Sequence, residues 1–60
     1  MRIKEVKSII SAYLNKPVHN IFWFTTDQEG YDWYYVKDDI KIQRIVKFDN
    51  YSAQVVQVLH

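Results

Sequence analysis

The side chains of this sequence that could bind a metal are isolated from one another. His19 and His60 are the only histidines, cysteine is absent, and neither histidine has a second ligand at a metal-binding spacing. Lone histidines of this kind are typical of a strand edge and of a chain end. We therefore expect no metal site and no bound cofactor.

Carboxylates and serines are also poorly placed for catalysis. Asp38 and Asp39 are adjacent, and Asp27 lies near Glu29, but both pairs fall where the chain should turn. A catalytic carboxyl needs a shielded pocket that shifts its pKa, whereas turn carboxylates of a small domain are solvated. The serines lack the Gly-x-Ser-x-Gly context of a nucleophile, and one glycine cannot form a glycine-rich phosphate loop. We expect that the protein is not an enzyme and has no catalytic residues.

Length and composition set the class of protein. Sixty residues make a single domain, which we place over residues 1–60. Hydrophobic residues make up 48% of the chain, which indicates folding rather than disorder. Apolar runs such as 21–24 are far shorter than the ~20 residues of a membrane-spanning helix, and we expect no membrane partner. The absence of cysteine and of a secretion-signal pattern predicts a cytoplasmic location.

The first quarter of the chain predicts an amphipathic helix over residues 2–15. Its apolar residues recur at spacings of three and four, at Ile3, Val6, Ile10, Tyr13 and Leu14. Pro17 disfavours helical backbone at the residue before it and ends the helix.

The chain then changes to aromatic and β-branched residues, which predict antiparallel strands. We expect these strands at residues 19–26, 31–37 and 40–48, joined by a loop at 27–30 and a turn at 38–39. Residues 51–60 fit either a fourth strand, favoured by their valines, or a short helix capped by Asn50, and we favour the strand. The predicted fold is α+β, with the N-terminal helix packed on one face of a three- to four-stranded antiparallel meander.

These loop lengths also predict which residues share a face of the sheet. In the first hairpin, Phe22 would lie opposite Tyr35 and Phe24 opposite Trp33. In the second hairpin, Trp33 would lie opposite Arg44 and Tyr35 opposite Ile42. The helix should cover the face that carries Phe22, Phe24, Tyr31, Trp33, Tyr35, Ile40, Ile42, Val46 and Phe48. The uncovered face should carry Ile21, Trp23, Thr25, Asp32, Tyr34, Val36, Lys41, Gln43, Ile45 and Lys47. A slip of one residue in either hairpin would exchange the two faces.

An uncovered apolar face predicts an interaction surface, and Trp and Tyr dominate such surfaces. We expect its contact residues to be Ile21, Trp23, Tyr34, Val36, Lys41 and Lys47. The predicted function is a non-enzymatic protein-binding module that masks, bridges or inhibits a larger partner, or that self-associates. Its small size is typical of modules encoded by phage and other mobile elements, and we expect such an origin.

The alternative is a small domain that binds RNA or single-stranded DNA through the same face. Trp23 and Tyr34 would stack on bases, with Lys41 and Lys47 near the phosphates. A net charge of +1, without a basic stripe, ranks this alternative second.

Overall fold

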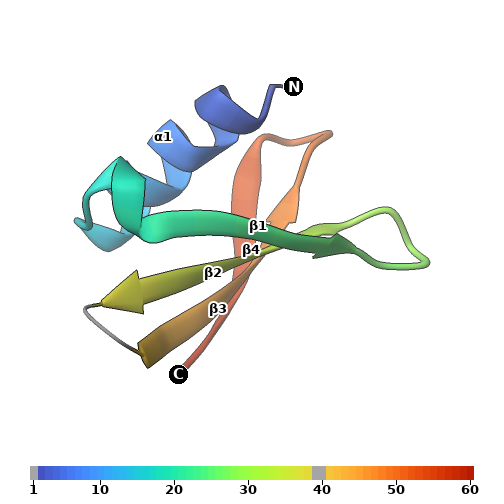
Figure 1. Ribbon diagram of the computed structural model, residues 1–60. Helices are drawn as coiled ribbons and strands as arrows, with labels where there is room; N and C mark the ends of the chain where they lie inside the picture. The colour runs from blue at the N-terminus through green and yellow to red at the C-terminus, as the bar shows by residue number, and fades with distance from the viewer. Residues whose placement is uncertain (1, 39–40) are drawn as a thin grey trace.

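The computed structural model describes residues 2–38 and 41–60, which form a helix packed on a four-stranded antiparallel sheet (Figure 1). The elements, in chain order, are α1 (Ile3–Leu14), a 3-10 helix η1 (Val18–Asn20), β1 (Ile21–Thr26), β2 (Asp32–Asp38), β3 (Lys41–Asp49) and β4 (Gln54–Leu59). The strands lie side by side in the order β1-β2-β3-β4. The predicted α+β fold is confirmed, and the last segment is a strand. Asp39 of the predicted turn and Ile40 of the predicted core face lie outside the described residues.

The helix ends where the sequence predicts. Asn15 takes a left-handed backbone conformation with φ of 56°, and the Lys16 N–H donates to the Ser11 carbonyl oxygen at 3.1 Å. Asparagine enters this conformation more readily than most residues. Pro17 then holds an extended backbone, so the chain leaves the helix and turns into η1 and β1.

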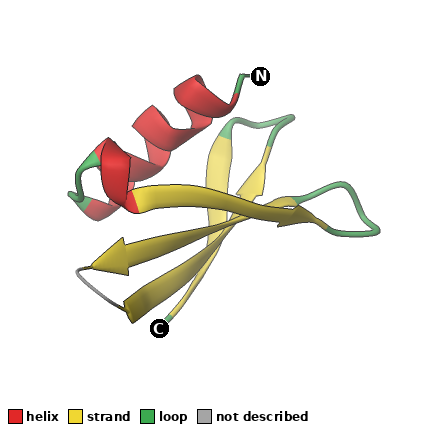
Figure 2. Ribbon diagram, in the orientation of Figure 1, coloured by secondary structure: helices red, strands yellow, loops and turns green. Residues whose placement is uncertain are grey.

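The core lies between α1 and one face of the sheet. Seven side chains are fully buried there: Val6, Ile10, Ile21, Tyr34, Val36, Val46 and Phe48. Within the described residues, Figure 2 shows helix on this side of the sheet and none against the other. The burial of Ile21, Tyr34 and Val36 shows that the predicted assignment of the two faces is wrong.

The first hairpin has the predicted pairing over its first half. Phe22 lies opposite Tyr35, as expected. Phe24 is then an extra, bulged residue, so Trp33 pairs with Thr25 rather than with Phe24. The bulge places Thr25 on the side of Trp33 rather than of Trp23, which corrects the predicted position of Thr25. The other predicted groupings within β1 and β2 agree with the pairing, but the helix covers the opposite group from the one predicted.

The second hairpin explains that error. Tyr35 lies opposite Ile45 rather than Ile42, because Asp38 pairs with Lys41 and because Gln43 forms a bulge in β3. Moving a turn by one residue changes each cross-strand partner by two positions and leaves the faces as they were. The single extra residue of the bulge changes the partner by one position and exchanges the faces of the rest of β3.

The exchange decides which face is the more apolar. Val46 and Phe48 now lie on the side of Tyr34 and Val36, together with Ile21. Burial of apolar area is the main driving force of folding, so this face is the one that the helix covers.

The left-handed backbone of Ala53 gives a test of this geometry. Ala53, just before β4, has φ of 56°, a region that glycine enters without steric cost. We expect Ala53→Gly to raise the free energy of unfolding by roughly 0.5 kcal/mol, since the larger entropy of the unfolded glycine chain offsets part of the gain. The same change at the exposed helical Ala12 should lower it by about 1 kcal/mol. Urea unfolding measures both free energies. If Ala53→Gly lowered the free energy of unfolding as much as Ala12→Gly, the result would contradict the left-handed backbone of Ala53.

The hydroxyl group of Tyr34 gives a second test. It is buried and has no hydrogen-bond partner among the described residues, and burial raises the pKa of Tyr34, with the charge of Asp32 adding to the rise. An unsatisfied buried polar group costs about 1–3 kcal/mol. We therefore expect Tyr34→Phe to raise the free energy of unfolding by about 1 kcal/mol. Tyr35→Phe, at a half-buried ring on the other face, should change it little, and equal effects in thermal melts would be evidence against this burial.

Candidate functional site

The candidate site is the sheet face that α1 does not cover, which we call the open face. Its residues are Phe22, Phe24, Tyr31, Trp33, Tyr35, Ile45, Lys47 and Leu59. Phe24 is 58% exposed and Leu59 43% exposed, whereas Trp33 and Tyr35 are half-buried by their neighbours. The open face thus has a partly shielded aromatic centre with exposed apolar groups beside it.

Three rings of the open face pack against one another across β1 and β2. The Phe22 and Tyr35 rings are stacked, with centroids 5.3 Å apart and an interplanar angle of 22°. The Phe24 ring meets the Tyr35 ring edge to face, with a centroid distance of 6.3 Å. Such pairs contribute about 0.5–1.5 kcal/mol each beyond the area they bury, so the rings are held in place before any partner binds.

A second group of rings surrounds Lys47, which lies opposite Trp33 in the β2–β3 pairing. The Lys47 ammonium nitrogen is 4.2 Å from the centroid of the Tyr31 ring and 5.6 Å from that of Trp33. At the β1 edge, the ammonium of Lys7 lies 5.7 Å from the Phe22 centroid. Cations are attracted to the negative faces of aromatic rings, so both lysines are drawn onto the aromatic groups.

Asp27 fixes the indole of Trp33. Its Oδ2 accepts a hydrogen bond from Trp33 Nε1 at 2.9 Å, and its Oδ1 accepts the backbone N–H groups of Glu29 and Tyr31 at 3.0 Å. One carboxylate therefore folds the β1–β2 loop and orients a ring of the open face.

These bonds favour the charged form of Asp27. The Trp33 hydrogen bond is the main cause that lowers the pKa of Asp27; desolvation opposes it, and the two backbone bonds and the positive charge of Lys47 lower the pKa further. The carboxylate is therefore ionised at neutral pH and accepts all three hydrogen bonds.

The structure separates the six residues that the sequence predicts as partner contacts. Ile21, Tyr34 and Val36 are fully buried under α1, so they offer no surface to a partner. Trp23 is 47% exposed on the same side of the sheet as Tyr34. Lys41 is exposed at the start of β3.

Lys47 is the predicted contact that lies among the rings of the open face. The sequence predicts the rings themselves on the face covered by the helix, but the structure places them on the open face: Phe22, Phe24, Tyr31, Trp33 and Tyr35. Alternation in the sequence predicts that these rings share a face, but the face that the helix covers depends on the register of β3.

Other kinds of site receive no support within the described residues. No three histidine or carboxylate side chains there gather where they could hold a metal ion. Over the same part of the chain, no helix has the length and apolar character needed to cross a membrane.

Comparisons of the chain with protein-family models, with curated proteins and with solved structures find no match. The function of the open face is therefore inferred from its geometry.

The Asp27–Trp33 bond predicts a pH-dependent change in the indole environment. Because the folded-state pKa of Asp27 is lowered, its stabilising contribution is complete above the ordinary carboxyl value of 3.8 and is lost as the pH falls through the lower folded-state value. In a Trp23→Phe background, we expect Trp33 fluorescence to change in that acidic range while circular dichroism still shows the fold. Asp27→Asn, whose amide nitrogen cannot accept the indole N–H, should remove this transition. An unchanged acid transition in the Asn variant would show that another group controls Trp33.

Proposed function

We propose that this protein is a non-enzymatic protein-binding module whose open face contacts a partner. The observation that carries the proposal is the aromatic cluster on the sheet face that α1 leaves uncovered. Contiguous exposed apolar patches on small proteins mark interaction sites. In this role the protein would mask or inhibit the partner surface that it covers.

The arrangement of the open face resembles that of a binding hot spot. Trp33 and Tyr35 are half-buried at its centre, while Phe24 and Leu59 lie more exposed beside them. Trp and Tyr contribute most to binding when surrounding contacts exclude water. The stacked rings and the Asp27 bond hold these side chains in place, so little side-chain entropy is lost on association.

The chemistry of the open face suggests what the partner presents. The cluster of Phe22, Phe24 and Tyr35 is apolar and fits an apolar side chain of the partner. Lys47 and Asp27, of opposite charge, lie together at Trp33 and suit polar groups around that anchor.

A second candidate function is binding of RNA or single-stranded DNA, because two lysines lie over rings of this face. Two features rank it second. Phe22 and Tyr35 already stack on each other, which covers a ring face that a base would need. The Asp27 carboxylate beside Trp33 would repel a phosphate backbone.

We also propose a cellular location and an origin for the protein. A cytoplasmic location fits a chain without cysteine, and a phage or other mobile-element origin fits its small size. Neither of these bears on the geometry of the open face.

Phe24 offers the sharpest test of the proposal. It is exposed, so Phe24→Ala should weaken partner binding at least tenfold, about 1.4 kcal/mol, with a smaller loss of stability. Tyr51→Ala is the matched control, since Tyr51 is fully exposed and lies outside the open face. The measurement is quantitative capture from nuclease-treated lysate, together with sedimentation equilibrium from micromolar to millimolar protein to detect self-association. Equal binding by the Phe24 and Tyr51 variants would refute the open face as the contact surface.

A salt titration separates the two candidate functions. We expect weak binding to a random single-stranded oligonucleotide, with affinity unchanged when Lys7 and Lys47 are both replaced by Gln. Tight binding with a steep salt dependence, flattened in that double variant but not in Lys4→Gln on the exposed helix surface, would establish nucleic-acid binding instead.

A further inference from the structure

An apolar groove lies between α1 and the start of β4, on the side of the sheet opposite the open face. It has a volume of about 430 Å³ and is lined by Ile9, Ala12, Tyr13, Ala53, Gln54 and Val55. That volume is in the range of sites that hold a small ligand or a few side chains. None of the lining residues carries a charge.

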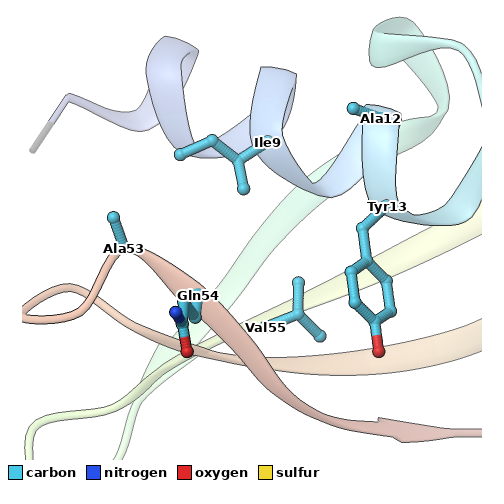
Figure 3. Close-up of a pocket in the computed structure, with 6 residues that line it drawn as sticks. All are labelled: Ile9, Ala12, Tyr13, Ala53, Gln54 and Val55. Atoms are coloured by element: carbon cyan, nitrogen blue, oxygen red, sulfur yellow. The ribbon is translucent and has the colours of Figure 1, made fainter.

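Figure 3 shows how the groove forms. Ile9 and Tyr13 point from α1 toward β4, while Ala53 and Val55 point back toward the helix. The alanines at positions 12 and 53 are small, and Tyr13 is 63% exposed, so these side chains leave the space between the two elements unfilled. The groove therefore suits an apolar side chain, with the Tyr13 hydroxyl at its edge.

The groove adjoins the free edge of β4. Within the described sheet β4 pairs with β3 alone, so the backbone groups on its other edge have no strand partner there. Exposed edges are usually protected by charged residues, but Gln54–Leu59 has the sequence QVVQVL and no charge. A backbone edge beside a side-chain pocket is the arrangement used for recognition by strand addition.

We propose that an extended, uncharged peptide segment of a partner chain adds to β4 as a fifth strand and places an apolar side chain in the groove. Alternate side chains of an added strand point to the helix side of the sheet, where the groove lies. Backbone hydrogen bonds to β4 supply affinity, and the groove selects the apolar residue.

The bulge at Val56 favours a peptide over a second copy of the chain. Val56 is the extra residue between Val55 and Gln57 in the pairing of β4 with β3. Two copies of β4 paired around a two-fold axis would bring both bulges close to the centre of the seam and interrupt the ladder there. A short peptide needs regular pairing only beside the groove.

This site does not depend on the proposed function of the open face. The two surfaces lie on opposite sides of the sheet, so both could be occupied at once. Occupation of both would make the protein a bridge between two partners.

The test begins with selection of a displayed library of random decapeptides on the full chain. The best sequence is then synthesised with a fluorophore, and its affinity is measured by anisotropy. We expect enrichment of uncharged peptides with apolar residues at alternate positions. Failure to enrich any peptide over a blank surface would overturn the proposal.

Two helix variants locate the peptide. Ala12→Leu fills the groove at an exposed helical position and should weaken the selected peptide at least tenfold. Ser8→Leu adds the same side chain to α1 outside the groove and should leave the affinity unchanged, and circular dichroism checks that both fold. If Ala12→Leu leaves peptide binding intact and Phe24→Ala removes it, the peptide binds to the open face. That result would overturn the groove as the binding site and would support the proposed function.

Backbone methylation tests strand addition on the unaltered protein. Two versions of the peptide carry N-methyl groups on alternate residues, one set on odd and one on even positions. Only one edge of an added strand faces β4, so one version should lose binding at least tenfold and the other should retain it. Equal affinities of the two versions would rule out pairing with β4.

Discussion

The extra residue in β3 is the constraint on which both surfaces of this protein depend. The bulge at Gln43 shifts the rest of β3 by one residue and turns Val46 and Phe48 toward the side of Tyr34 and Val36. That side becomes the more apolar one and is buried under α1. The aromatic residues of the opposite face remain uncovered, so one backbone irregularity separates a core from a binding surface.

Each edge strand of the sheet also has one irregularity, at Phe24 in β1 and at Val56 in β4. Bulges raise the local twist and break the regular ladder that a neighbouring chain would extend. Neither Ile21–Thr26 nor Gln54–Leu59 carries an ionisable side chain, so the bulges limit edge-to-edge pairing where charged residues do not. Such edges resist long self-pairing, yet they leave room for a short added strand beside the α1–β4 groove.

Local rules fixed much of the fold in advance. The three- and four-residue spacing of apolar residues predicts α1, Pro17 predicts its end, and alternation predicts that Phe22 and Tyr35 share a face. The side that α1 covers could not be predicted in the same way, because the alternation of apolar and polar residues in β3 does not indicate where a bulge occurs. Both faces of this sheet are rich in apolar residues, so composition alone does not identify the face that the helix covers.

The candidate site also could not be predicted without the register of β3. A shift of one residue exchanges the faces of a strand. Because the predicted register of β3 omits the one-residue bulge, Ile21, Tyr34 and Val36 are predicted on the surface, whereas they lie in the core. The position of Lys47 beside Tyr31 and Trp33 follows from the register of β3, whereas the Phe22–Tyr35 stack lies within the first hairpin and does not depend on it.

The Asp27–Trp33 bond is also independent of β3, because Asp27 lies in the loop of the hairpin that contains Trp33. Contacts within the first hairpin thus position the rings of β1 and β2, while the bulge in β3 adds Ile45 and Lys47 to the same face.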